Sequence, residues 1–242
     1  MSLMNKQSAK HEGGFSLIEL IIAMTITLVV LGIATTLLAQ TFRVRTRAND
    51  NVDALADAQR ALNIMSREIA QAGFNLSDNG IVAADSVTDA NNNSTIRIRA
   101  NLNKFDTSFS TTARNGIGVQ GEDAGEDVMY YIFPAPQNNT TLLARYDALA
   151  SGGGSSSVLA NRLDSLRIHY FAQKVTYSTL NCDITAPSAL EVASPAQARY
   201  IVIAVCVWQE EVGVPGSPGY HPRGPVLLTS DVTLRNSNLN NY

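Results

Sequence analysis

One carboxylate lies inside the longest apolar stretch of this 242-residue chain. The stretch opens with Gly13-Gly14-Phe15-Ser16-Leu17-Ile18-Glu19 and continues to about Ala39, and Glu19 is the single ionisable side chain within it. About 20 apolar residues in a helix span the hydrocarbon core of a bilayer. A carboxylate placed there costs roughly 2.5–3.5 kcal/mol on insertion scales. Glu19 is therefore the first candidate for a functional group, and its chemistry would be that of a charge that needs a partner.

The same residues resemble the signal of a known family. The pattern Gly-Phe-Ser-Leu-Ile-Glu-Leu at residues 14–20, after a short leader that contains lysine, resembles the class III signal of type IV pilins and type II secretion pseudopilins. In that family a membrane peptidase cuts after the glycine and methylates the new N-terminal residue. The resemblance implies that the chain is cut after Gly14, that Phe15 is N-methylated, and that the leader 1–14 is lost.

Two other interpretations of the apolar stretch fit it less well. An ordinary secretory signal has an apolar region of roughly 7–15 residues and a small-x-small cleavage site, whereas this stretch is longer and Leu37-Leu38-Ala39 lacks that pattern. A plain transmembrane anchor explains neither Glu19 nor the Gly14-Phe15 junction. Arginines follow the stretch at positions 43, 45 and 47, so the positive-inside rule alone does not place residues 40–242 outside the cytoplasm. That orientation is what the resemblance implies.

The resemblance also implies a partner for Glu19. In a filament of such subunits the N-terminal helices bundle, and the amine of the processed Phe15 lies in an apolar interior. A carboxylate and an amine buried there compensate each other's charge, within a subunit or between subunits. The pair would set the axial register, because a wrong offset leaves both charges unpaired. A Glu19 that is protonated, or that reaches the surface without a partner, is the alternative.

The other candidates for chemistry in the sequence are weaker. The acidic segment 122–127 offers oxygen ligands for Ca²⁺, but its spacing does not match a 12-residue calcium loop. We therefore expect a solvated acidic turn. The histidines are far apart in the sequence, so we expect structural or surface roles and no metal site for His11, His169 and His221. The chain contains no nucleophile elbow, zinc pair or dinucleotide-binding pattern, so no catalytic residue and no cofactor is expected. Core or sheet-face positions are expected for Trp208, Tyr130, Tyr131, Tyr170 and Tyr200.

Composition limits the class of partner and the compartment. The net charge is −3, from 18 basic and 21 acidic residues, and the basic residues form no cluster of the kind that binds nucleic acid. The length allows one anchor helix and one soluble domain with a single core. The two cysteines are Cys182 and Cys206. In an exported domain they are candidates for a disulfide, and a pair of buried free thiols is the alternative.

A helical pattern continues beyond the apolar stretch. An apolar stripe with helical spacing is formed by Val52, Leu55, Leu62, Met65 and Ile69. No proline interrupts residues 15–73, and Gly73 suits the left-handed cap that ends a helix. We therefore expect one helix from about residue 16 to 72, in which Gly32 and the threonines at 35 and 36 allow local bending.

After residue 80 the pattern changes to that of β-strands. The segment 95–100 alternates apolar and polar residues, and 199–208 is a continuous apolar run that predicts a buried central strand. The strands expected from such patterns are 95–100, 127–133, 141–146, 166–171, 199–208 and 226–234, with the second and third as a hairpin and the last returning beside the fifth. Residues 152–157 are expected as a flexible connection. The segment 214–225, with four prolines, is expected as an irregular loop.

Two short segments narrow the resemblance within the family. The segment 67–74, Arg-Glu-Ile-Ala-Gln-Ala-Gly-Phe, resembles the helix end of the PilW group of minor pilins, and J-type pseudopilins have a similar segment. The segment 233–236 resembles PilW-type endings. The implied fold is α+β, a long N-terminal helix packed on an antiparallel sheet. Its parts are the leader 1–14, a transmembrane and filament-core half 15–39, an amphipathic half 40–73 and a soluble β-rich domain 74–242.

The resemblance implies a structural, non-enzymatic function. The expected protein is a PilW-like minor type IV pilin that helps start pilus assembly at or near the filament tip. A J-type minor pseudopilin of a type II secretion system is one alternative, and a membrane-anchored adhesin or ligand-binding module that uses loops such as 212–225 is another. Expected partners are prepilin peptidase, other minor pilins with the major pilin or pseudopilins, and a tip adhesin. The expected location is the bacterial inner membrane with the C-terminal domain in the periplasm, and then a surface pilus or a periplasmic pseudopilus.

Overall fold

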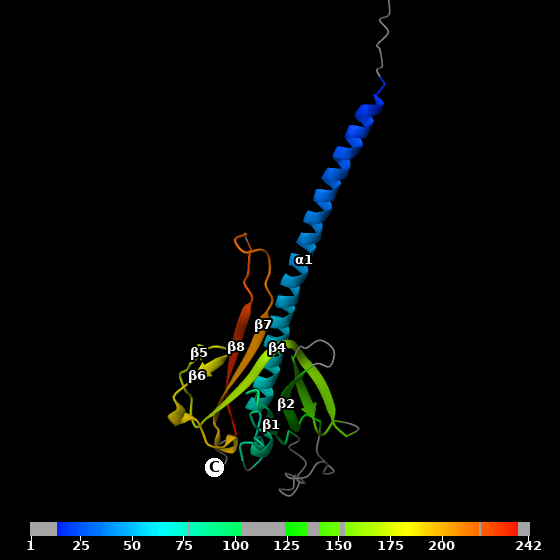
Figure 1. The fold of residues 1–242 in the computed structure, drawn as a ribbon. Coiled ribbons are helices and arrows are strands. Elements are labelled where there is room, and N and C mark those ends of the chain that lie inside the picture. The colour runs from blue at the N-terminus through cyan, green and yellow to red at the C-terminus, as the bar shows by residue number, and fades with distance from the viewer. Residues whose placement is uncertain are drawn as a thin grey trace, which may run out of the picture. The chain divides into compact units, whose positions relative to one another are not determined.

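A computed structural model of the chain describes residues 14–76, 78–102, 124–134, 141–150, 153–217 and 219–236. The chain forms two compact units, divided between Thr46 and Arg47. Helix α1, Leu17–Ala70, passes from the first unit into the second, and the β-structure belongs to the second unit. The α+β architecture predicted from the resemblance is confirmed (Figure 1).

Helix α1 is assigned without interruption through residues 32–36. In the second unit its buried face consists of Asn51, Ala54, Ala58, Ala61, Leu62, Met65 and Ile69. The predicted stripe was wrong at Val52, whose side chain is 63% exposed. At 3.6 residues per turn Val52 points about 120° away from Ala58, which lies at the centre of the buried face. Small alanines on this face allow the helix to approach the sheet closely.

The helix ends before a pair of closely packed glycines. Gly73 has φ 75° and Gly80 has φ 73°, both in the left-handed region. The Gly73 N–H donates to the carbonyl of Arg99 over 2.9 Å, and the Arg99 N–H donates to the carbonyl of Gly80 over 2.7 Å. The chain therefore passes from the end of the helix to the edge of the sheet through backbone contacts that leave no room for a side chain.

Six antiparallel strands form the main sheet in the order β1-β2-β3-β4-β7-β8. Their bounds are Ile96–Arg99, Asp127–Pro134, Thr141–Asp147, Ser155–Phe171, Tyr200–Gln209 and Gly224–Thr233. A separate two-stranded sheet pairs β5, Ser178–Leu180, with β6, Asp183–Thr185. The short 3-10 helices are η1 Ala83–Asp85, η3 Ser188–Leu190 and η4 Pro195–Gln197.

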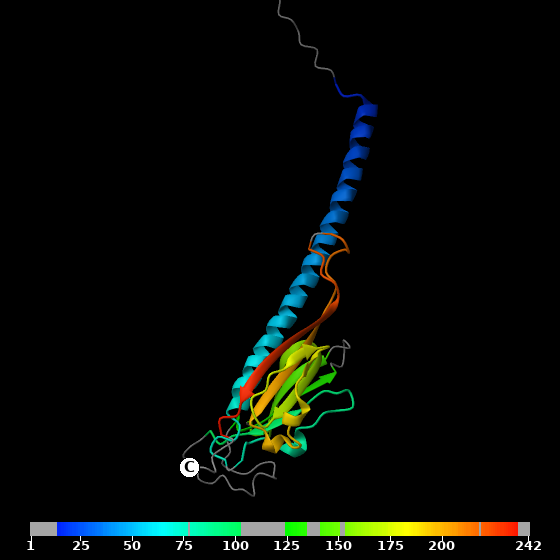
Figure 2. The same cartoon turned by 90° about the vertical axis from the view of Figure 1, so that its left-hand side faces the viewer.

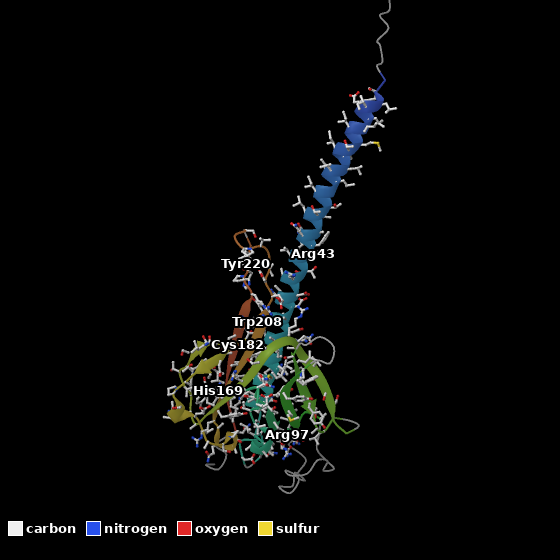
Figure 3. The ribbon with its side chains drawn as sticks, in the orientation of Figure 1. Arg43, Arg97, His169, Cys182, Trp208 and Tyr220 are labelled. Carbon is white, nitrogen blue, oxygen red and sulfur yellow. A yellow bond between two sulfur atoms is a disulfide. The ribbon has the colours of Figure 1, made fainter. Side chains whose placement is uncertain are left out.

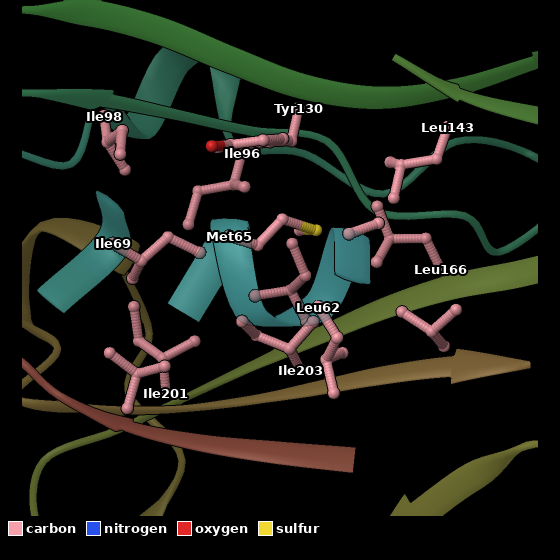
Figure 4. Close-up of a cluster of buried hydrophobic side chains, with 14 of the residues drawn as sticks. Leu62, Met65, Ile69, Ile96, Ile98, Tyr130, Leu143, Leu166, Ile201 and Ile203 are labelled. Atoms are coloured by element: carbon pink, nitrogen blue, oxygen red, sulfur yellow. The ribbon is translucent and has the colours of Figure 1, made fainter. Parts of the chain in front are cut away.

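The sheet has a core on each face. Toward the helix, Leu62, Met65 and Ile69 pack with side chains from β1, β2, β3, β4 and β7 (Figure 4). On the other face the segment between β4 and β7 covers Phe171, Tyr200 and Val202. Strand β7 is buried on both faces, which explains why its sequence is an unbroken apolar run. The prediction of a buried strand is confirmed, although β7 is not at the centre of the sheet but next to the edge strand β8.

Two sequence expectations were wrong at strand ends. Residues 155–157, expected in a flexible connection, begin the 17-residue strand β4 and pair with β3. Residues 224 and 225, expected in an irregular loop, begin β8. Strand β4 reaches this length because irregularities in its pairing absorb local mismatch, with Arg162 at φ 57° next to the register shift between Leu163 and Ser165.

Candidate processing and assembly site

The predicted cleavage junction lies just outside the helix. Gly14, Phe15 and Ser16 precede α1, and the Ser16 carbonyl accepts hydrogen bonds from the N–H groups of Glu19 and Leu20, over 3.0 and 3.1 Å. The side chain of Phe15 is 84% exposed. The bond between Gly14 and Phe15 is therefore in non-helical backbone at the edge of the helix, where a peptidase can bind it in extended form.

Glu19 lies in the first turn of α1. A carboxylate in that turn interacts favourably with the N-terminal end of the helix dipole. Its side chain is exposed, and none of the ion pairs among the described residues includes it. The geometry thus leaves the carboxylate open to a group from outside the described part of this subunit.

The first unit is a helix with an apolar surface. It is long and apolar enough to cross a membrane, by length and composition, and its apolar window has no buried residue. Its threonine hydroxyls are satisfied internally, since each donates to a carbonyl three or four residues earlier: Thr25, Thr27, Thr35, Thr36, Thr41 and Thr46. This removes most of the cost of placing these hydroxyls in a hydrocarbon phase. From the sequence, only the pair at 35 and 36 was noted, as a site of local bending.

In the second unit a polar cluster joins the helix to the sheet. The hydroxyl of the buried Tyr130 donates to the carboxylate of Glu68, and Arg145 Nε donates to the same carboxylate over 3.0 Å. Burial, with the charge of Glu68 second, raises the pKa of Tyr130 above its usual value. Through Glu68, the last turn of the helix is therefore attached to strands β2 and β3.

The acidic segment before β2 differs from the expectation. Glu126 and Asp127 are 3% and 7% exposed, so the prediction of a solvated turn was wrong for both. Asp127 accepts two hydrogen bonds from Arg97, over 2.7 and 2.8 Å, and one from Arg99 over 2.8 Å. The bonds to Asp127 raise the pKa of Arg97. Asp127 is thus held by two cations across the β1–β2 pair, and residues 122 and 123 lie outside the described residues.

Cys182 and Cys206 form a disulfide, with Cα atoms 5.3 Å apart. Of the two alternatives that the sequence left open, the structure has the bridged one. Cys206 is buried in β7, and Cys182 lies in the turn between β5 and β6. Asn181 and Cys182 have φ 47° and 63°, as in a two-residue hairpin turn with both central residues left-handed. The bridge therefore attaches the small hairpin to β7 of the main sheet.

His169 lies on β4 and Trp208 on β7 (Figure 3), while His221 lies in the segment between β7 and β8. His169 Nε2 is 2.7 Å from Asp183 Oδ1, and His221 Nδ1 is 2.9 Å from the Pro222 carbonyl oxygen. Trp208 is 37% exposed, with the guanidinium carbon of Arg223 5.3 Å from its ring centroid. His11 lies outside the described residues. Of the predicted core or sheet-face tyrosines, Tyr130 and Tyr200 are buried, and Tyr131 and Tyr170 are half-buried.

Among the described residues, the group with ligand atoms close enough for a metal ion is Asp164 with Cys182 and Cys206. Both sulfur atoms are used in the disulfide, so neither is available as a thiolate ligand. This group therefore gives no support for a metal centre.

Comparison with known proteins agrees with the N-terminal geometry. The family model described as the prokaryotic N-terminal methylation motif matches residues 9–35. The chain carries the class III signal of the type IV pilin-like family. This pilin-like signal implies processing by prepilin peptidase and assembly with pilin-type partners, and together with the apolar helix it indicates anchoring in a membrane. Pilin-like proteins are a structural class and not a class of enzymes. No curated protein and no solved structure matches the chain.

Proposed function

We propose that the chain is a PilW-like minor pilin that helps to start the assembly of a type IV pilus and is placed at or near its tip. The observation that carries the proposal is Glu19 in the first turn of an exposed apolar helix, next to the non-helical Gly14-Phe15 junction. Cleavage after Gly14 places the new amine of Phe15 four residues before Glu19 in the sequence. The leader is then 1–14, the membrane and filament-core segment 15–39, the amphipathic helix 40–73 and the soluble domain 74–242.

In this proposal Glu19 pairs with a Phe15 amine, its own or that of an adjacent subunit. Both groups would otherwise be uncompensated charges in an apolar bundle, so the pair favours one axial register. The internally bonded threonines support this function, because they satisfy their own hydroxyls and leave Glu19 as the one ionisable side chain of the apolar segment that still needs a partner.

The test replaces Glu19 with valine in the full chain. Glu19→Val should insert into the membrane, since removing the carboxylate makes insertion easier, but it should be largely absent from sheared surface filaments. Thr25→Val is the matched control, because it removes a polar group of the same segment that is already satisfied by Ile22. Wild-type incorporation of Glu19→Val would contradict the pairing.

The processing step has its own measurement. The intact mass of the membrane-extracted protein should correspond to a chain that begins at methylated Phe15. A mature chain that still contains Met1, or one that begins after Ala39, would exclude the pilin-type pathway.

A J-type minor pseudopilin remains the second candidate, because its family shares the segment around Glu68 and Gly73. Deletion of the gene should reduce the number of surface filaments if the chain is a pilin, and should block secretion if it is a pseudopilin. A soluble fragment 40–242 should rescue neither, because it lacks the bundling helix. Full rescue by that fragment would favour an adhesin or ligand-binding module.

A further inference from the structure

The segment between β7 and β8 forms an ordered projection. We call its described residues, 210–217 and 219–223, the finger. Val212 and His221 exchange two backbone hydrogen bonds, over 3.0 and 2.9 Å, so the two arms of the finger are paired. Ser217 Oγ donates to the Val214 carbonyl over 2.6 Å, and the Tyr220 N–H donates to the Ser217 carbonyl over 3.1 Å. Figures 1 and 2 show the finger extending beyond the ends of β7 and β8.

The base of the finger is attached to the first residues of the second unit. Asn51 Nδ2 donates to the Glu210 carbonyl over 2.9 Å, and the Glu210 N–H donates to Asn51 Oδ1 over 3.1 Å. An open cavity of about 710 Å³ beside this base is lined by Arg47, Trp208 and Arg223 among others. The finger thus leaves the sheet at the end where the chain enters the unit, and not at the end where α1 stops.

The tip differs chemically from the base. The sequence from Val212 to Tyr220 contains no Asp, Glu, Lys, Arg or His, whereas acidic residues and Arg223 flank it. Val214 is 67% exposed, and Pro215 is exposed beside it. Tyrosine is enriched where membrane meets water, since its ring is apolar and its hydroxyl is polar. The exposed valine and proline at the tip suit the boundary between headgroups and acyl chains, and Tyr220, whose hydroxyl lies beside the Glu211 carboxylate, suits its polar side.

Chain connectivity keeps this end of the unit near a membrane. The apolar segment ends at about Ala39, and the helical stretch from Ala39 to Arg47 is about 12 Å long at 1.5 Å per residue. This length limits the distance between Arg47 and the membrane, whatever the orientation of the second unit. The arm of the finger from Glu210 to Pro215 reaches at most about 16 Å at 3.3 Å per residue. The helical stretch from Ala39 to Arg47 and the arm of the finger are therefore of similar length, so the tip can reach the surface in which the helix is anchored.

We propose that the tip of the finger contacts the phospholipid headgroup layer while the subunit is anchored in the membrane before assembly. The contact would hold the soluble unit in a fixed orientation at the bilayer surface. A lipid surface fits better than a protein partner for two reasons. Residues 212–220 carry no charged side chain that would specify a protein partner, and the short stretch from Ala39 to Arg47 already keeps the tip near the bilayer. The proposal goes beyond the pilin function and requires only that the apolar helix is membrane-inserted.

The experiment measures the depth of the tip in the full-length protein. Because the two native cysteines are bridged, Val214→Cys introduces a single free thiol for a fluorophore. The matched control is Gln71→Cys, an exposed position about 30 Å from Asn51 along the helix. Both proteins are placed in nanodiscs of phosphatidylethanolamine and phosphatidylglycerol that contain a lipid with a nitroxide on its headgroup.

The label at position 214 should lose most of its fluorescence, and the label at position 71 should lose little. Equal quenching at the two positions would overturn the proposal. A label at position 214 that is unquenched in nanodiscs but cross-links to another subunit in assembled filaments would assign the tip to protein docking instead. Ile26→Cys, inside the apolar segment, must be quenched by a nitroxide on the acyl chain. If it is not, the membrane premise fails, and the finger proposal fails with it.

Discussion

Asn51 and Glu210 form a reciprocal pair of hydrogen bonds across 159 positions of sequence. The side-chain amide of Asn51 satisfies both backbone groups of the residue that follows β7, over 2.9 and 3.1 Å, as a neighbouring strand would. Asn51 is 8% exposed and occupies the same helical face as Ala54 and Ala58. One side chain therefore joins the amphipathic half of α1 to the end of β7 and to the base of the finger.

Replacing Asn51 should destabilise the second unit. Asn51→Ala leaves the N–H and C=O of Glu210 without these partners, and each bond of this kind contributes about 0.5–1.5 kcal/mol, with a larger cost for a buried group left unsatisfied. We expect the free energy of unfolding to fall by about 1–3 kcal/mol. Unfolding in urea, followed by the fluorescence of the single tryptophan, Trp208, measures it.

Asn63→Ala is the matched control, because Asn63 is an exposed asparagine of the same helix. It should leave stability unchanged or raise it slightly, since alanine is the better helix former. Equal losses in the two variants would show that the Asn51–Glu210 bonds contribute nothing beyond helix propensity.

Local patterns predicted the helix, most of the main-sheet strands and the N-terminal signal, but not the small sheet of β5 and β6 or the first half of β4. The class III signal is contiguous, so its residues could be recognised without a fold, and the apolar run of β7 marked a buried strand. The buried face of α1 was less accurate, because it is built mainly from alanines such as Ala54, Ala58 and Ala61, while the larger Val52 points away from the sheet. Size was therefore a misleading guide to which residues face the sheet.

Contacts between distant residues could not be predicted from patterns. Asp127 pairs with Arg97 and Arg99 only because β1 and β2 are aligned in one register, with Arg99 opposite Asp127. Asn51 did carry a signal that was missed. A polar residue spaced three and seven positions before Ala54 and Ala58 on a buried face requires a hydrogen-bond partner. The sequence does not indicate that this partner is Glu210.

The contact between Gly73 and Gly80 predicts a severe effect of a single methyl group. A Cβ at position 80 would lie 2.0 Å from the Gly73 nitrogen and 2.3 Å from the Arg99 carbonyl oxygen, both backbone atoms. The left-handed φ of 73° adds strain for any other residue. We expect Gly80→Ala to lower the free energy of unfolding by at least about 2 kcal/mol. Gly224→Ala, where a Cβ meets nothing within 4 Å, should have little effect.

The disulfide predicts a redox-dependent stability. The bridge closes a loop with a sequence separation of 24, and restricting such a loop in the unfolded chain is worth about 3 kcal/mol in the chain-entropy model. Cys182→Ser should lose this stabilisation, and it avoids placing a hydroxyl at the fully buried position of Cys206. Under reducing conditions the wild type and Cys182→Ser should have similar stability. Free thiols in denatured, non-reduced protein from its native compartment would contradict the bridge.

Three tyrosines with raised pKa values predict that the second unit loses stability at alkaline pH. Burial is the main cause that raises the pKa of Tyr130, Tyr170 and Tyr200 above the usual value of 10.0. A tyrosine whose pKa is raised in the folded state contributes its full stabilisation below pH 10. This stabilisation is lost as the pH rises through the folded pKa, because the unfolded chain releases its protons first. Each such tyrosine lowers the free energy of unfolding by about 1.4 kcal/mol per pH unit above 10. Urea unfolding at several pH values between 9 and 11.5 measures the slope of the free energy of unfolding against pH. Tyr170→Phe should reduce this slope by the contribution of one tyrosine. A stability that is flat across this range, or an unchanged slope in Tyr170→Phe, would show that these phenols ionise freely in the folded protein.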